Sequence, residues 1–156
     1  MYKFSDNNEN KDISLHDCRA EKIIIGDKSL SFVFENGIYI FAENVNNYNE
    51  KLSYTDKAEI VFDTIHKNIE TDVIIYIFSK TEEENKSVRE EISLAEFADM
   101  MNNGAELEFI NSYKGDLVYL FDCWLWFENE PYHKECEIII SAYELTYYWN
   151  ELYIEE

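Results

Sequence analysis

The sequence predicts an α+β domain that is mostly antiparallel β, with about nine strands in meanders and hairpins and one clear helix near residues 94–103. Two patterns support this prediction. Runs of β-branched and aromatic residues recur with turn residues between them, and only one segment spaces its apolar residues as a helix does. The 156-residue chain is long enough to bury its own core, so we expect a single domain over residues 13–156. Residues 1–12 are polar and are expected to be frayed.

The first strands are expected within residues 14–43. Segments 23–25, 30–34 and 38–42 are rich in β-branched and aromatic residues. Asn36-Gly37, between the last two segments, is a strong hairpin signal because both turn residues tolerate positive φ. The three segments therefore predict a three-stranded meander.

Two further strands are predicted in the middle of the chain. Residues 43–56, before them, are rich in asparagine and fit either a short helix or a loop. Ala58, Ile60 and Phe62 alternate with Glu59 and Asp63, which indicates a strand with one wet face. Residues 73–78 are apolar on both parities and predict a central strand covered on both sides. Residues 81–86 are polar and predict a solvated hairpin tip.

A helix is predicted over residues 94–103. Ser93 and Glu96 form a capping-box pattern, in which the serine side chain accepts a hydrogen bond from the third helical N–H. Gly104 follows at the position of a left-handed C-cap. The apolar residues that share one face of this helix are Leu94, Phe97, Ala98 and Met101.

The C-terminal part of the chain predicts long strands. Residues 107–113 and 117–127 flank a Lys114-Gly115 turn and are expected to form a hairpin. Pro131 marks a break, and residues 135–148 supply at least one more long strand.

The chain has a formal net charge of −20, although 46% of its residues are hydrophobic. Residues 90–156 hold sixteen acids and two lysines, a net charge of −14, and they also hold all three tryptophans. A negative field of this size repels phosphate backbones and anionic lipid headgroups, so nucleic acids and membranes are excluded as expected ligands. A basic protein is the expected partner.

The cysteines and the N-terminus predict a cytoplasmic protein. Cys18, Cys123 and Cys136 are an odd number without a CxxC motif, which is typical of free, buried thiols in a reducing compartment. The N-terminus has no apolar segment of the kind found in signal peptides.

Catalytic chemistry has little support in the sequence. His16 and Cys18 would share one face of an extended strand, but Asp17 would point away, so these neighbours do not form a triad. The four glycines do not form a phosphate-binding loop, and no cofactor is expected. We therefore expect a protein that is not an enzyme. The alternative is a small hydrolase or a zinc-binding protein that uses His16, Cys18, His133 and Cys136.

Aromatic and acidic residues occur together in two C-terminal segments, and both types recur at protein interfaces. In the first segment, alternation places Asp122, Trp124 and Trp126 on one face and Cys123, Leu125 and Phe127 on the other, and one of these faces is expected to be the inner one. At least two of Trp124, Trp126 and Phe127 are expected to be core residues. Residues 147–149, in the second segment, fit a core position and a partner contact equally well. The predicted partner-binding residues are Asp122, Trp124, Trp126, Glu128, Glu130, Tyr147, Tyr148, Trp149 and Glu151.

The opening pattern from Leu15-His16-Asp17-Cys18 to Phe34-Glu35-Asn36-Gly37, followed by interspersed acidic and aromatic residues, resembles small acidic bacterial immunity proteins. Those proteins neutralise basic toxin domains of polymorphic toxin systems. The resemblance is one of size, charge and composition. It implies no catalysis and tight one-to-one binding of a cationic toxin surface. The alternative is a structural or assembly domain that forms a homodimer through an exposed strand edge.

Overall fold

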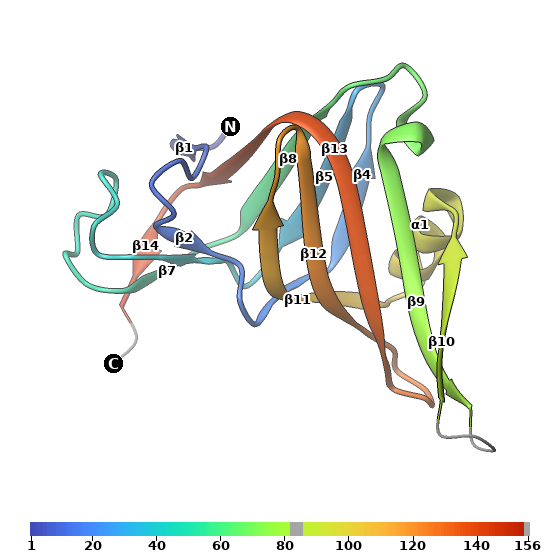
Figure 1. Cartoon of the computed structure of the whole chain (residues 1–156). Helices are drawn as coiled ribbons and strands as arrows, with labels where there is room; N and C mark the ends of the chain where they lie inside the picture. Colours follow the sequence, from blue (N-terminus) through green and yellow to red (C-terminus); the bar gives the residue numbers. More distant parts are fainter. Residues whose placement is uncertain (82–85, 155–156) are drawn as a thin grey trace.

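The computed structural model describes residues 1–81 and 86–154, and within these ranges it contains fourteen strands, one α-helix and one 3-10 helix (Figure 1). The prediction of a mostly antiparallel β fold with one helix is confirmed. The ten strands of the large sheet are β1 (Phe4–Asp6), β3 (Cys18–Ala20), β4 (Lys22–Ile25), β5 (Ser29–Phe34), β8 (Ala58–Thr64), β9 (Val73–Thr81), β10 (Lys86–Ile92), β11 (Glu106–Lys114), β12 (Val118–Trp126) and β13 (His133–Trp149). The small sheet contains β2 (Ile13–Ser14), β6 (Tyr39–Ile40), β7 (Ser53–Thr55) and β14 (Leu152–Tyr153), and the helices are η1 (Ile69–Asp72) and α1 (Leu94–Asn102).

Strand β13 organises the large sheet. It is 17 residues long, and its first half pairs with β12 on one edge and β9 on the other. Its second half pairs with β1 and β8. The register shifts between Ala142 and Glu144, where the partners change, and such a bulge bends a strand. The large sheet therefore consists of two halves that share β13.

The segment β3–β4 joins the two halves a second time. Strand β3 pairs with β11 in one half, and β4 pairs with β5 in the other. Between them, the N–H of Glu21 donates to the carbonyl of Val33 at 3.0 Å. The two halves thus turn their inner faces toward each other.

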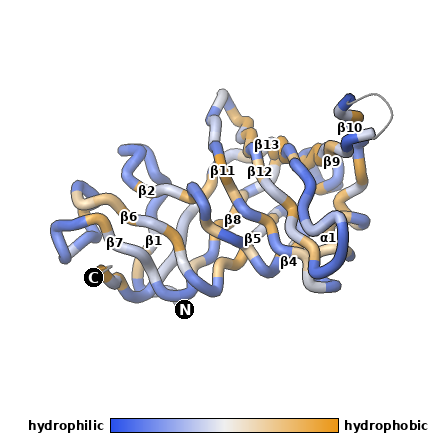
Figure 2. Tube along the Cα trace, turned by 90° about the horizontal axis from the view of Figure 1, so that it is seen from below, coloured by the Kyte–Doolittle hydropathy of each residue, from blue (hydrophilic) through white to orange (hydrophobic). Residues whose placement is uncertain are grey.

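The core lies between these inner faces. Phe62 of β8 meets Phe121 of β12 edge to face, with ring centroids 5.8 Å apart. Phe32 of β5 meets Phe109 of β11 in the same manner at 5.5 Å. Each of these rings is at most 2% exposed. Such pairs contribute roughly 0.5–1.5 kcal/mol beyond the apolar area they bury. Figure 2 shows hydrophobic and hydrophilic residues alternating along the strands, as expected for a sheet with one inner face.

Helix α1 begins and ends close to its predicted bounds. The Oγ atom of Ser93 accepts a hydrogen bond from the N–H of Glu96 at 3.1 Å, and Gly104 has a φ of +101°. Leu94, Phe97 and Met101 are buried. The helix packs against β4 and β9, on the same side of β9 as β4 and β5 (Figure 1). No helix in the described ranges is both long and apolar enough to cross a lipid bilayer.

The predicted meander in residues 14–43 is correct for two of its three strands. Strands β4 and β5 pair as expected, but β6 leaves this sheet and pairs with β2 and β7. Gly37 has a φ of +81°, and the Ile38 N–H donates to Thr55 Oγ1 at 3.0 Å. The turn therefore directs the chain toward β7 instead of back along β5.

The N-terminal segment, where the sequence predicts a frayed end, is attached to the large sheet through β1. Strand β1 pairs with the end of β13, and the Phe4 ring stacks on the Trp149 ring with centroids 5.8 Å apart. Lys3 also forms an ion pair with Glu151. Residues 2–6 are held by contacts with residues far away in the sequence, which local composition does not reveal.

The asparagine-rich segment 43–56 forms turns followed by β7 and contains no helix. The side-chain amide of Asn47 donates to the carbonyl groups of Ile40, Phe41 and Lys51 at 2.8–3.2 Å. These bonds replace the backbone pairing that a helix would supply.

The remaining strand predictions concern residues 58–148. Strands β8, β11, β12 and β13 lie where the sequence predicts strands. Strand β9 is internal, between β13 and β10, but only one of its faces is buried. The predicted hairpin tip at 81–86 falls mainly on residues 82–85, outside the described residues.

A buried carboxylate fixes the connection from β8 to η1. The Asp72 side chain is fully buried and accepts hydrogen bonds from the backbone N–H groups of Ile65 and His66 at 2.9 and 2.7 Å. The Nδ1 atom of the half-exposed His66 ring lies 2.5 Å from its other oxygen. Burial raises the pKa of the Asp72 carboxyl, but these hydrogen bonds outweigh burial, so the pKa lies below its ordinary value of 3.8.

We predict that this carboxylate makes stability fall in acid. Because the folded-state pKa is lowered, the contribution is present above the unfolded-state value and is lost as the pH falls through the folded-state value. Asp72→Asn is expected to cost about 1–3 kcal/mol at neutral pH and to flatten the acid dependence. Urea unfolding between neutral and acidic pH measures both effects. Asp116→Asn, in an exposed turn, is the control, and equal slopes for the two variants would contradict the prediction.

Candidate protein-binding site

The outer side of β11, β12, β13, β9 and β10 carries aromatic and acidic side chains together. Asp122, Trp124 and Trp126 share this side and are half-buried, whereas Cys123 and Leu125 lie on the opposite side and are buried. The expectation that at least two of Trp124, Trp126 and Phe127 are core residues is wrong, because all three are only half-buried. Cross-strand neighbours lie on the same side of a sheet, so the register identifies the remaining members. We define the aromatic–acidic face as Tyr76, Phe78, Glu106, Glu108, Asp122, Trp124, Trp126, His133, Glu135 and Glu137.

The register arranges these side chains in rows across the sheet. In one row Trp124 lies between Glu108 and Glu135, and Glu135 is followed by Phe78. In the next row Asp122 lies directly opposite Glu137, which is followed by Tyr76. In a third row Trp126 lies between Glu106 and His133. Carboxylates and aromatic rings are therefore intermixed across this side of the sheet.

No helix or strand of the described chain covers the central part of this face. In Figure 1 the face is toward the viewer over β12 and β13, while β4, β5 and α1 lie behind. The side chains of β12 on this side are half-buried, whereas those on the inner side are buried. The face is an unpartnered sheet surface.

The edge of the face at β3 is neutralised from within the chain. The Arg19 guanidinium lies 3.3 Å from Glu106 and 3.9 Å from Glu108, and it sits over the Trp126 ring at 4.4 Å from the centroid. The Trp126 Nε1–H also donates to Glu108 at 3.3 Å. The His133 ring contacts this group, with its centroid 4.9 Å from that of Trp126.

The centre of the face is not neutralised. Asp122, Glu135 and Glu137 make no ion pair with any residue in the described ranges. They surround a hollow of about 350 Å³ whose other lining side chains include Trp124 and Phe78. Because like charges directly opposite each other in a sheet are destabilising, the pair formed by Asp122 and Glu137 costs the free protein stability.

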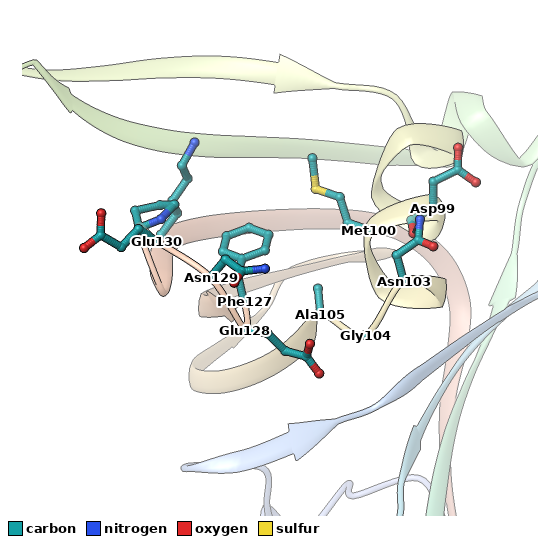
Figure 3. Close-up of a pocket in the computed structure, with 11 residues that line it drawn as sticks. Asp99, Met100, Asn103, Gly104, Ala105, Phe127, Glu128, Asn129 and Glu130 are labelled. Carbon is teal, nitrogen blue, oxygen red and sulfur yellow. Dashed lines mark hydrogen bonds between the residues drawn. The ribbon is translucent and has the colours of Figure 1, made fainter.

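Two predicted residues, Glu128 and Glu130, lie in the β12–β13 connection and line a separate cavity of about 530 Å³ beside the end of α1. Figure 3 shows the Phe127 ring and the Met100 side chain between the loop and the helix, with the carboxylates of Glu128, Glu130 and Asp99 pointing in different directions around them. The last turn of α1 contains no basic residue. This cavity has an apolar interior, and the charged residues that line it are Asp99, Glu128, Glu130 and Lys134.

The second predicted segment does not form an exposed site. Tyr147 is 5% exposed and Trp149 is fully buried, so neither ring is available to a partner. Tyr148 is half-buried and packs against Tyr2, with ring centroids 5.7 Å apart. Glu151 pairs with Lys3. These four residues stabilise the attachment of β1 and the C-terminal turn.

The histidines and cysteines do not come together. No group of three or more His, Cys, Asp or Glu side chains in the described part of the chain is placed to hold a metal ion. Asp17 has a φ of +64°, so His16 and Cys18 are not on one extended strand, and the His16 Nδ1 atom lies 2.7 Å from the Ile110 carbonyl. His133 lies on the outer side of the sheet and Cys136 on the inner side.

The sequence prediction missed seven members of the face, which are Tyr76, Phe78, Glu106, Glu108, His133, Glu135 and Glu137. Residues 73–78 are apolar on both parities, which indicated burial on both sides. Glu135 and Glu137 alternate with buried residues in β13, and this alternation is the sequence pattern that could have placed them on the outer side of the sheet. Pairing β13 with both β12 and β9 is what joins these residues to Trp124.

Comparison of the chain with models of protein families, with curated proteins and with solved structures found no match.

We predict that the three thiols are unreactive in the folded protein. All three are free and buried, and burial raises the pKa of Cys18 and of Cys136 to about 12 and that of Cys123 well above its ordinary value. At about pH 8 they are therefore expected to react with Ellman's reagent far more slowly than in urea. Rapid labelling of one equivalent without denaturant would contradict this.

We also predict that the acidic pair at the centre of the face lowers stability. Glu137→Gln removes the repulsion from Asp122 and should raise the free energy of unfolding by about 0.2–1 kcal/mol. Urea unfolding at low salt measures the gain, which should shrink at high salt because salt screens exposed charges. Glu43→Gln, an exposed acid away from the sheet face, is the control, and a loss of stability in Glu137→Gln alone would refute the prediction.

Proposed function

We propose that this chain is a non-enzymatic binding protein that engages a basic protein through the aromatic–acidic face. The partner that best suits its charge is a toxin domain, which the chain would neutralise in the cytoplasm as an immunity protein does. The observation that carries the proposal is the centre of the face, where Asp122, Glu135 and Glu137 lie among aromatic rings without a counter-charge. A cationic partner would supply that charge.

The composition of the face supports a protein partner. Tryptophan and tyrosine provide much contact area with little loss of side-chain entropy, and they are common among residues that dominate binding energy. Carboxylates around them would accelerate encounter with a basic surface and disfavour acidic competitors. Trp124, near the middle of the face, is positioned as the principal contact residue.

The alternative of a homodimer through a strand edge has less support. Strand β10 is an edge of the large sheet, but its exposed residues include Lys86, Arg89, Glu90 and Glu91. Charged side chains on an edge strand oppose edge-to-edge pairing. Two copies meeting through the aromatic–acidic face would also bring like charges together.

We predict salt-sensitive binding to a basic partner that depends on Trp124. The probe is the basic protein encoded by a gene adjacent to the gene for this chain, with cytochrome c as a basic protein of unrelated origin. Trp124→Ala is expected to weaken binding about tenfold or more, whereas Tyr153→Ala, an exposed aromatic in the small sheet, should have little effect. Calorimetric titration at low and high salt measures the affinities.

The outcomes separate the candidate functions. Tight one-to-one binding of the adjacent product, weak binding of cytochrome c and loss on Trp124→Ala support the proposal. Equal affinity for the two basic proteins would indicate nonspecific charge attraction and would overturn the proposed function. A salt-independent dimer by light scattering, with no binding of the adjacent product, would favour the assembly domain.

A further inference from the structure

Both arginines of the sequence lie over aromatic rings of the outer side of the sheet. Arg19, from β3, sits over Trp126 at 4.4 Å from the ring centroid. Arg89, from β10, sits over Tyr76 at 4.2 Å. In the register Trp126 lies next to Glu106, and Tyr76 lies between Glu91 and Glu137. The chain thus holds guanidinium groups on this surface twice, once near each edge.

Between these two arginines the same arrangement recurs without a cation. Trp124 and Phe78 are separated by Glu135 in the register, and the next row places Asp122 opposite Glu137. These five side chains line the hollow of about 350 Å³. The hollow therefore combines aromatic walls with three carboxylates that no described residue neutralises.

The charge distribution around Trp124 restricts a cation to this hollow. The neighbouring depression, of about 440 Å³, is lined by Lys80 and Lys134 as well as by Glu135, so its lining carries more positive than negative side chains. The hollow contains no basic side chain in its lining. A cationic group approaching Trp124 is thus directed toward Asp122 and Glu137.

We propose that this hollow binds an arginine side chain of the basic partner, an inference that rests on the proposed function. A planar guanidinium can stack on the rings of Trp124 or Phe78 while its N–H groups reach carboxylates at the sides. A lysine ammonium is more strongly hydrated and has no flat face. It can therefore pair with the carboxylates of the hollow, but it cannot stack on the aromatic rings. The site therefore distinguishes two residues of equal charge.

The test uses acetyl-arginine amide and acetyl-lysine amide as probes of equal charge, titrated into the full chain at low salt and followed by ¹H–¹⁵N spectra. The arginine probe is expected to bind about two- to fivefold more tightly and to shift the Trp124 indole N–H signal and the backbone signals of Glu135 and Glu137. Glu135→Gln/Glu137→Gln should weaken its binding about threefold or more. The matched control, Glu43→Gln/Glu96→Gln, removes the same charge from exposed positions off the face. Thermal unfolding of both double variants verifies that they fold.

Each outcome decides the inference. Preference for the arginine probe that is lost in Glu135→Gln/Glu137→Gln but kept in the control supports it. Equal binding of the two probes, or equal loss in both double variants, would mean general charge attraction and overturn it. If the adjacent basic protein binds through Trp124 while the arginine probe shows no preference, the inference fails and the proposed function stands. If the probe binds as expected but no basic protein does, the proposed function fails instead.

Discussion

The pairing of both edges of β13 with two successive sets of strands is the constraint on which the rest of the structure depends. Along one edge it pairs with β12 and β1, and along the other with β9 and β8. The bulge between Ala142 and Glu144 lets one strand serve two sheet halves whose inner faces meet. The aromatic core, the attachment of the N-terminus and the outer face all follow from this arrangement.

The sequence predicted the elements whose signals are local. The cap at Ser93, the apolar spacing of α1 and the alternation in β12 are all set by neighbouring residues, and each is found as expected. The alternation also placed Asp122, Trp124 and Trp126 on one side of the sheet. Many of the undetected strands are two or three residues long, which is too short for an alternating pattern to be recognised.

The incorrect predictions concern partners that lie far away in the chain. Asn36-Gly37 predicts a hairpin turn. In the structure the N–H of the next residue, Ile38, instead donates a hydrogen bond to Thr55, and the chain continues into β6, which pairs with β7 in the small sheet. From the sequence alone, a core position and a partner contact were equally consistent with Trp149. The structure buries Trp149, and the ring of Phe4 stacks on it. The aromatic–acidic face could be predicted only in its β12 part, because its other members join it through the register of β13.

The pairing of β1 with β13 also has a consequence for how the chain acquires its structure during synthesis. Phe4 and Trp149 are partners, so β1 leaves the ribosome long before the strand with which it pairs. Until β13 emerges, β8, β9 and β12 each lack one neighbour, and the sheet cannot be completed. Contacts between distant residues make folding slow. The strand edges exposed in this interval are the points at which a nascent chain is most open to association with other chains.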